Sequence, residues 1–237
     1  LPPQRRRGAG MGVRAKLSGL LLALGLGAAS LCALALRPRL HVLLQEWSGA
    51  ATASSQLTHT ERLAVARALT AYLGGAPAEL PTLWQCEGAP PGGASPRAQA
   101  HLRDVRTIFQ WLGRLRLAGM AALAVLLLQP GLQRARALYN AGTSSLAVAG
   151  LLGLAALIDF RRLFGSYHRL LFRDENWRLD PQEDYLALLY PEAVYRLGAL
   201  LWSALWALAG GLLLLVARGH AKQNASYSRI QRSISRE

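Results

Sequence analysis

Two histidines of this chain lie where they could transfer protons at the edge of a membrane. His101 is followed three residues later by Asp104, a spacing that places both side chains on one face of a helix. His168 follows Tyr167 in a separate stretch of the sequence. An imidazole exchanges protons near neutral pH because its ordinary pKa is about 6.5. Acid and base chemistry is one interpretation of His101 and His168, beside that of ordinary interfacial histidines, and it requires that the surrounding elements bring the two rings together.

Composition and apolar stretches predict the elements that hold these residues. The 237 residues are 52% hydrophobic and carry a formal net charge of +14, which is typical of a small polytopic membrane protein. A helix that crosses a bilayer core of about 30 Å needs roughly 20 apolar residues. Three uncharged stretches satisfy this requirement, 17–36, 137–158 and 197–217. The stretch 108–128 is counted as a fourth span, because Arg114 and Arg116 lie near its start and long Arg side chains there can reach the headgroups. We predict an all-α membrane protein, a four-transmembrane-helix bundle with a small, mostly helical extracytoplasmic cap.

The distribution of charge predicts the orientation of the spans. Glu237 is the single acidic residue in three basic segments, which are 1–16, 129–136 and 218–237. All other Asp and Glu residues lie in the segments 37–107 and 159–196. Cytoplasmic segments carry the excess of Lys and Arg. We therefore predict that both termini are cytoplasmic and that the two segments that contain the other acids form the extracytoplasmic cap, which carries His101 and His168.

The first outer segment, 37–107, carries signals for two helices. Thr58 and Glu61 form a capping-box pattern, which predicts a short helix that ends at Gly74 and Gly75. Ser95 and Pro96 predict the start of another helix, which runs directly into the second span. The stretch 40–56 is compatible with a short strand or a helix. The segment leaves little room for a core of its own.

The second outer segment, 159–196, begins where the third span ends. Phe160, Phe164 and His168 recur every four residues and are predicted to share one face of a continuing helix. Asp180, Pro181 and Glu183 predict the cap of a further short helix, and Pro191 predicts the start of the fourth span. Four residues are predicted to contact lipid headgroups: Arg161, Arg162, Arg169 and Trp177.

Several functional classes are disfavoured by the sequence. The basic residues flank apolar stretches instead of covering a soluble domain, so we predict no nucleic-acid partner. The two cysteines, Cys32 and Cys86, lie in an apolar stretch and in a loop, and neither a disulfide nor zinc-type spacing is expected. A transporter is disfavoured because the four spans show no buried charge at mid-depth and no internal repeat. No GxSxG, HExxH, P-loop or Rossmann pattern occurs.

Three short motifs resemble a known family. They are HLRDV at 101–105, YHRLLF at 167–172 and DPQEDYLALLYPE at 180–192. In this order and in these loops they are similar to the Lit family, the bacterial lipoprotein intramolecular transacylases. The sequence departs from the family pattern at Tyr167, where Phe is common, at Leu171, where an aromatic residue is common, and at Ala193 and Val194. These departures concern packing and leave both histidine positions in place.

The resemblance implies acyl transfer within one substrate molecule in the bacterial cytoplasmic membrane. The sn-2 acyl chain of an S-diacylglyceryl-cysteine lipoprotein would move to the α-amine of the same cysteine and give the lyso form. The implied partners are this lipoprotein and membrane phospholipid, and the chain is expected to act as a monomer without a cofactor or a metal. The substrate amine is itself the nucleophile, so no enzyme nucleophile is needed.

The roles of individual residues follow from the motifs and from the chemistry. One histidine would act as general base on the amine, and the other as proton donor or oxyanion stabiliser. The motif favours His101 as base with Asp104 orienting it. Two further residues have candidate supporting roles: Tyr167 as a hydroxyl near the ester, and Asp184 as a residue that orients the second segment or holds Arg169. Glu192 is a further candidate to orient this segment or to hold Arg169.

Other interpretations of the same residues remain open. A histidine beside an interfacial helix is commonly an ordinary surface residue, and we interpret His41 and His59 in this way. His101, His168 and nearby carboxylates could instead bind a metal, although no HxxxH or CxxC spacing supports it. The chain could also be a non-enzymatic accessory protein with an external cap.

Overall fold

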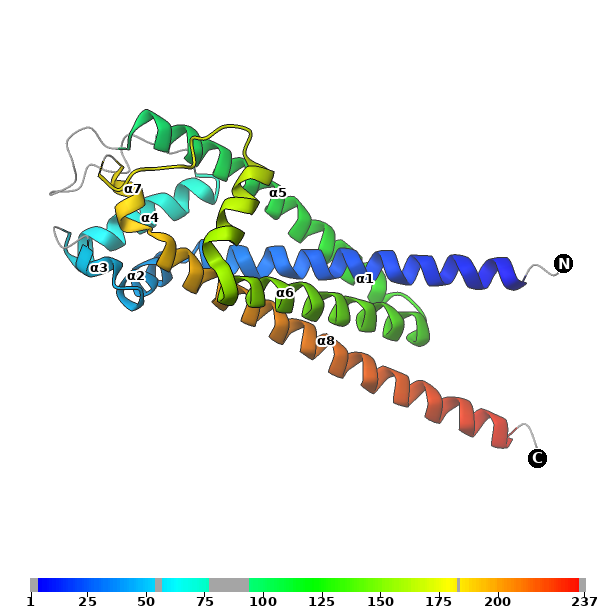
Figure 1. Cartoon of the computed structure of the whole chain (residues 1–237). Coiled ribbons are helices and arrows are strands. Elements are labelled where there is room, and N and C mark those ends of the chain that lie inside the picture. The colour runs from blue at the N-terminus through cyan, green and yellow to red at the C-terminus, as the bar shows by residue number, and fades with distance from the viewer. Residues whose placement is uncertain (1–3, 54–56, 77–93, 183, 235–237) are drawn as a thin grey trace. The chain divides into compact units, whose positions relative to one another are not determined.

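The structure, a computed structural model, describes residues 4–53, 57–76, 94–182 and 184–234, and every regular element in these ranges is an α-helix (Figure 1). Four helices are long and apolar enough to cross a membrane: α1 (Gln4–Ala35), α5 (Pro96–Leu127), α6 (Gly131–Leu171) and α8 (Glu192–Ile234). Four shorter helices complete the described residues: α2 (Pro38–Trp47), α3 (Ala50–Ala53), α4 (His59–Leu73) and α7 (Tyr185–Leu189). The predicted all-α class with four long apolar helices is confirmed.

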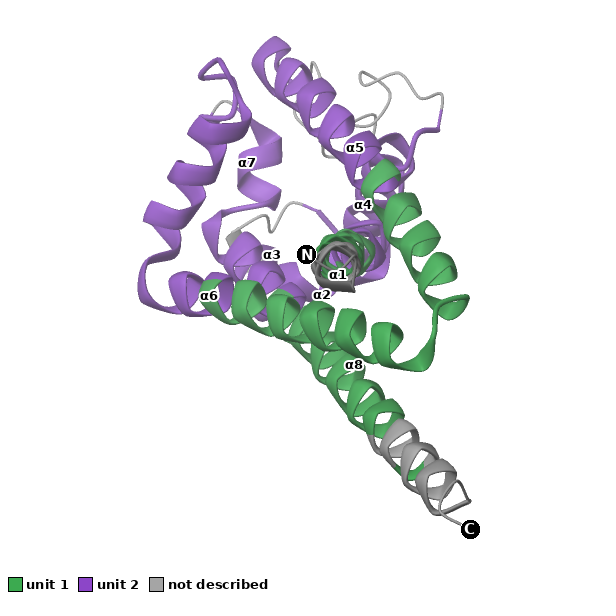
Figure 2. Ribbon diagram, turned by 90° about the vertical axis from the view of Figure 1, so that its right-hand side faces the viewer, with its two compact units in different colours: residues 1–30, 114–151, 203–237 green, residues 31–113, 152–202 purple. Residues whose placement is uncertain are grey.

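The chain divides into two compact units (Figure 2). Unit 1 comprises residues 1–30, 114–151 and 203–237, and unit 2 comprises residues 31–113 and 152–202. Unit 1 therefore contains only parts of the long helices. Unit 2 contains the remaining parts of the long helices and all four short ones.

Glycines let the long helices of unit 1 approach each other closely. A Cβ atom on Gly25 of α1 would lie 2.5 Å from the Cα atom of Gly119 on α5. A Cβ atom on Gly210 of α8 would lie 2.7 Å from the Cβ atom of Ser145 on α6. Small residues at helix crossings allow backbones to pack directly where there is no hydrophobic driving force between helices in lipid. Close backbone contacts at these glycines therefore contribute to the packing of unit 1, beside a cluster of buried side chains that includes Leu22, Leu126 and Leu138.

Unit 2 has a hydrophobic core to which both outer segments contribute. Leu44 and Leu69 come from the first segment, and Leu186 and Leu189 come from the second. The two outer segments pool their apolar side chains in one cluster, and the first segment supplies the larger part of it. This shared core holds α4 and α7 beside the first part of α5.

The start signals read from the first outer segment are confirmed. Thr58 and Glu61 form the reciprocal hydrogen bonds of a capping box at the start of α4, and Gly74 is the C-cap of that helix. The Ser95 Oγ atom accepts a hydrogen bond from the Ala98 amide at 3.0 Å, at the start of α5. The stretch left open as strand or helix contains α2 and α3, which are both helical; its residues 54–56 lie outside the described ranges.

Two predictions for the second outer segment are wrong in detail. Helix α6 does not continue without interruption, because Asp159 adopts φ −152° and ψ 82°. The Asp159 Oδ1 atom accepts the Arg162 amide at 2.9 Å, so this aspartate caps a helix that restarts at Phe160. Asp180 does not cap α7. Its Oδ1 atom accepts the Gln182 amide at 2.8 Å in a local turn, and Asp184 is the N-cap residue.

Candidate active site

His101 lies in the second turn of α5, close to the capping residue that starts this helix. The side chain is 9% exposed, and its ring packs edge-on against the ring of Phe172 with centroids 4.9 Å apart. The Nδ1 atom of His101 is buried and has no hydrogen-bond partner. A buried nitrogen without a partner is costly to maintain, so it is available to a ligand that can supply a donor or an acceptor.

His168 lies on the part of α6 that restarts after Asp159, and it is 4% exposed. Its Nδ1–H donates a hydrogen bond to the Phe164 carbonyl at 2.8 Å. A carbonyl oxygen can only accept, so Nδ1 carries the hydrogen. In the neutral ring, the Nε2 atom is then the nitrogen with a free lone pair. The backbone of α6 thereby fixes both the tautomer and the orientation of His168.

The structure brings the two predicted histidines together. The ring centroids of His101 and His168 are 5.8 Å apart, and the ring planes are tilted by 36°. The Phe172 ring bridges them, because its centroid lies 4.9 Å from that of His101 and 5.3 Å from that of His168. The prediction that the rings lie together is confirmed; their chemical roles remain predictions.

Aromatic rings surround His168. Trp177 stacks on it with centroids 4.8 Å apart and planes inclined by 29°, and the Tyr167 ring lies 4.2 Å away. Phe164 is 4.1 Å from His168, one turn along the same face. The Arg178 guanidinium covers the Trp177 ring at 5.0 Å. The stacking of Trp177 on His168 was not predicted, because this tryptophan follows the helix in a segment with no periodic pattern.

The electrostatic surroundings favour neutral rings. Burial disfavours a charged imidazole, and among the described residues neither His101 nor His168 forms an ion pair. The acid that acts electrostatically on His101 is Asp174. Asp174 is exposed and accepts hydrogen bonds from the amide and side chain of Asn176. The site can therefore present an unprotonated nitrogen in apolar surroundings.

Asp104 does not orient His101 through Nδ1, because this atom has no partner. Asp104 is only partly buried, and its electrostatic neighbours are Asp174 and Arg103. Burial would strip a carboxylate of its hydration, so Asp104 stays near solvent while the imidazole of His101 turns inward. Sharing a helix face was thus insufficient to predict contact.

Asp184 is 3% exposed, and its Oδ1 atom is buried without a hydrogen-bond partner. It occupies the N-cap position of α7 without forming a side-chain cap. A buried unpartnered carboxylate oxygen is unusual, so Asp184 remains a candidate for a supporting role.

The predicted headgroup residues lie mostly on the surface. Arg161 is 87% exposed and pairs with Glu192 at 3.1 Å. Arg169 donates to the Ser166 hydroxyl at 3.4 Å, so the idea that Glu192 holds Arg169 is wrong. The reason is the register of the restarted helix, which presents Arg161 to the beginning of α8. Contact of Arg161, Arg162 and Arg169 with headgroups stays a prediction.

His41 is not the ordinary surface residue that we expected. Its Nε2–H donates to the Ala35 carbonyl at 2.8 Å, so its Nδ1 atom accepts from the Tyr190 hydroxyl at 3.0 Å. Burial lowers the pKa of His41 and raises the pKa of Tyr190. His41 therefore ties the end of α1 to the residue that follows α7. His59 is exposed, as predicted, and lies 3.9 Å from Glu46.

Two further predictions concern metals and cysteines. Among the residues that the structure describes, no three His, Cys, Asp or Glu side chains gather as a metal site requires. Cys32 is buried and forms no disulfide with a described residue. Cys86 and Glu183 lie outside the described ranges.

Comparison with known proteins decides the family. The family model described as lipoprotein intramolecular transacylase Lit matches residues 32–195, which include His101, His168 and both outer segments. The chain belongs to the Lit family. No curated protein matches the sequence.

Solved structures of membrane-integral Lit from Bacillus cereus share the fold. One has a TM-score of 0.81 at 18% identity and covers 92% of this chain and 99% of its own. Two others carry a single histidine substitution, to arginine or to alanine, and have TM-scores of 0.74 at 17% identity. The match to the arginine variant covers 94% of this chain and 97% of that structure's chain. The match to the alanine variant covers 95% of this chain and 100% of that structure's chain. The fold of this Lit-family chain is therefore that of a membrane-integral helical protein.

Proposed function

We propose that this Lit-family protein moves the sn-2 acyl chain of an S-diacylglyceryl-cysteine lipoprotein to the α-amine of that cysteine. The paired rings of His101 and His168, 5.8 Å apart in an aromatic site, carry the proposal. Family membership supports the lipoprotein as the substrate. The product is an N-acyl, S-monoacylglyceryl lipoprotein of unchanged mass.

In the first step the α-ammonium loses one proton to water, the free amine attacks the ester carbonyl carbon, and the attacking nitrogen gives up a second proton to His168. His168 is suited to accept this proton, because the hydrogen bond from its Nδ1 to Phe164 leaves the Nε2 lone pair free. This proposal assigns the base to His168, whereas the motif had favoured His101. The negative charge of the tetrahedral intermediate then develops on the former carbonyl oxygen.

In the second step the bond from the carbonyl carbon to the glycerol O2 atom breaks, and O2 takes up a proton. The proton that His168 accepted balances this step, and His101 is placed to pass it on or to donate a hydrogen bond to the oxyanion. The Tyr167 hydroxyl is a second possible donor at the ester. The amine and ester are already held in one molecule, which lowers the entropic cost of their encounter.

The test is mass spectrometry of the N-terminal peptide of a model lipoprotein from cells that lack or express this chain. We expect fragment ions that place one acyl group on nitrogen at unchanged peptide mass. His101→Gln and His168→Gln should each reduce conversion by about 10²–10⁴-fold. His59→Gln is the matched control, since this histidine belongs to the same unit and is 64% exposed. Full conversion by both active-site variants would overturn the histidine mechanism.

The same cells distinguish the two other interpretations. An accessory protein would tolerate both histidine substitutions, with its amount in the membrane unchanged. A metal-binding protein would be purified with a bound transition metal, and the two substitutions would reduce the metal content. Elemental analysis of the wild-type protein separates this case from acid and base catalysis.

We propose that both termini are cytoplasmic and that the histidine pair faces the extracytoplasmic side of the bacterial cytoplasmic membrane. The supporting observation is that the segments 1–16, 129–136 and 218–237 carry Lys and Arg with Glu237 as their single acid, and cytoplasmic segments are rich in Lys and Arg. A C-terminal reporter that is active only in the cytoplasm should be active. Inactivity of this reporter, with the fusion present in the membrane, would reverse the proposed orientation.

A further inference from the structure

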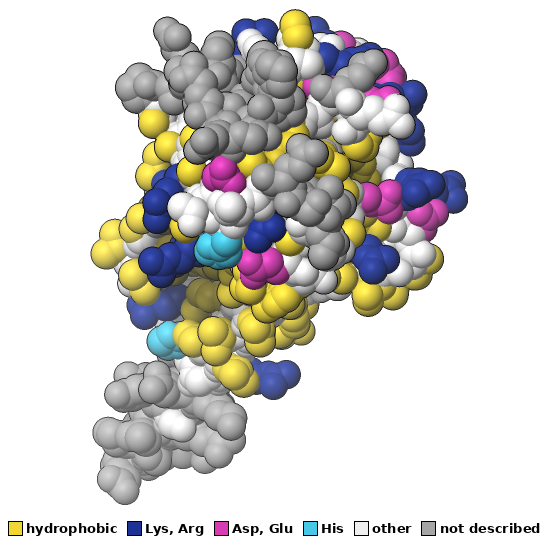
Figure 3. Space-filling model, turned by 90° about the vertical axis from the view of Figure 1, so that its left-hand side faces the viewer, with side chains coloured by type: hydrophobic (Ala, Val, Ile, Leu, Met, Phe, Trp, Pro, Cys, Tyr) yellow, Lys and Arg dark blue, Asp and Glu magenta, His cyan; other side chains and the backbone are white. Residues whose placement is uncertain are grey.

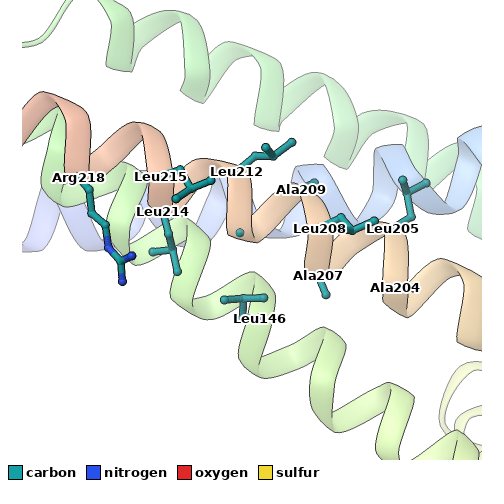
Figure 4. A pocket seen from close by; sticks show the side chains of 11 residues that line it. Leu146, Ala204, Leu205, Ala207, Leu208, Ala209, Leu212, Leu214, Leu215 and Arg218 are labelled. Atoms are coloured by element: carbon teal, nitrogen blue, oxygen red, sulfur yellow. The ribbon is translucent and has the colours of Figure 1, made fainter.

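An apolar groove runs along α8 in unit 1 and ends at an arginine. Its lining combines Leu146 of α6 with residues of α8 between Ala204 and Arg218, and its volume is about 1000 Å³. Figure 4 shows leucine and alanine side chains along this groove and the Arg218 guanidinium at one end. A groove of this kind accepts a flexible hydrocarbon chain, and the cation at its end favours an anionic group attached to that chain.

A second, basic pocket of about 410 Å³ adjoins the groove through the same arginine. Three long helices supply one cation each to this basic pocket: Lys16 of α1, Arg136 of α6 and Arg218 of α8. Tyr139 and Asn140 add polar side chains to its lining. Arg218 therefore links a site with anion-binding character to a site with lipid-binding character.

Acidic side chains do not neutralise the charges of the basic pocket within the described part of the chain. Among the described residues, none of the three cations belongs to an ion pair. The sequence explains this, because Glu237 is the single acid in unit 1. Like charges that face one pocket repel each other. The arrangement gains free energy when an anion enters and interacts with all three.

We propose that the apolar groove and the basic pocket together bind one anionic phospholipid. Its phosphate group contacts Lys16, Arg136 and Arg218, and one acyl chain lies along α8. Basic pockets between transmembrane helices recognise anionic headgroups in this way. The proposal concerns unit 1 and does not depend on acyl transfer at the histidine pair.

Three other occupants fit the observations less well. A zwitterionic phospholipid would bring its own cation to a pocket that already holds three. A free phosphate would leave the groove empty. A second copy of this chain would bring another strongly basic unit 1 and thus more positive charge. An anionic phospholipid alone satisfies both the charge and the apolar lining.

The first experiment uses native mass spectrometry of the purified full chain in detergent. Phosphatidylglycerol and phosphatidylcholine with identical acyl chains are added in equal amounts. We expect one phosphatidylglycerol to be retained in preference, and we expect retention to weaken as ionic strength rises. Equal retention of the two lipids, or an added second protein copy in place of a lipid, would overturn the proposal.

Substitutions then test the basic pocket. Lys16→Ala and Arg136→Ala should each weaken phosphatidylglycerol retention by about fivefold, the effect of one cation near a lipid headgroup. Arg116→Ala is the matched control, because Arg116 is an exposed cation of unit 1 that lines neither cavity. Circular dichroism and gel filtration confirm that each variant is folded. Equal retention by the pocket variants and by the control would contradict the assignment of the headgroup.

A separate substitution tests the apolar groove. Gly211 lines the groove, and a Cβ atom there would meet no atom within 4 Å, so Gly211→Leu fills the groove without a clash at Cβ. Gly150 has equally open surroundings on α6 and lines neither cavity, so Gly150→Leu is its control. We expect only Gly211→Leu to reduce retention. Displacement of the lipid by an acyl-free glycerophosphoglycerol at similar concentration would show an anion site alone and would overturn the role of the groove.

Discussion

The two units differ in where their charges lie and in what holds their helices together. Unit 1 contains 14 of the 27 Lys and Arg residues and one of the 13 acidic residues; unit 2 contains 13 and 12. The acidic side chains visible beside basic ones in Figure 3 therefore belong to unit 2. Unit 2 also contains His101 and His168, together with the aromatic rings around them. Unit 2, in which basic and acidic residues are nearly equal in number, therefore carries the groups that can transfer protons.

The two units also differ in how their residues pack. Unit 1 brings backbones together at glycines, such as Gly25 and Gly119. Unit 2 fills the space around its histidines with rings, such as Phe172 and Trp177. A unit packed through glycines should be sensitive to added atoms, and a site packed through rings should be sensitive to removed ones. This contrast can be tested by opposite kinds of substitution.

The largest effect is expected when the bridging ring of unit 2 is removed. Phe172→Ala deletes a buried side chain that contacts both histidines, so the rings lose their common support. We expect a loss of about 3–5 kcal/mol in the free energy of unfolding and a fall in lipoprotein conversion of up to about 100-fold. Denaturant unfolding and the peptide mass assay measure the two effects.

Phe109→Ala is the control for this substitution. Phe109 packs against the core of unit 2 but is not among the rings around the histidine pair. Stability should fall while conversion per folded molecule is retained. Equal losses of conversion in both variants would mean that Phe172 contributes only to stability.

A smaller effect is expected when atoms are added to unit 1. Gly25→Leu places a side chain where the Cα atom of Gly119 lies, so α1 and α5 must separate. Overpacking of this kind costs about 1–3 kcal/mol. Thermal unfolding in one detergent, compared with that of Gly150→Leu, checks the difference. If both leucine variants unfold at the same temperature, direct backbone packing does not hold these helices.

Local sequence patterns predicted the elements well, because spans, caps and turns depend on residues near each other in the chain. The capping box of Thr58 and Glu61 and the start of α5 after Ser95 are of this kind. The resemblance in three motifs also identified His101 and His168 as a pair. The break at Asp159 was missed, although an aspartate after an apolar stretch is a common N-cap residue.

Contacts between distant segments could not be predicted. Trp177 reaches His168 from a segment without helical periodicity, so no spacing rule connects the two rings. His41 and Tyr190 are 149 positions apart, and their hydrogen bond depends on how the two outer segments fold onto one core. Asp104 shows the opposite case, in which correct spacing on one helix did not produce the expected contact.

The smallest expected effect is on the pH dependence of stability, and it compares a buried with an exposed histidine of unit 2. Burial lowers the pKa of His41 below its unfolded value of about 6.5. The unfolded chain then binds a proton more readily than the folded one, so His41 contributes stability above pH 6.5 that is lost as pH falls toward its folded pKa. His41→Gln should flatten the fall in unfolding temperature between neutral and mildly acidic pH. His59→Gln changes an exposed position and should leave the dependence of the unfolding temperature on pH as in the wild type. If the wild type and both variants show the same dependence, the His41–Tyr190 hydrogen bond does not couple folding to pH.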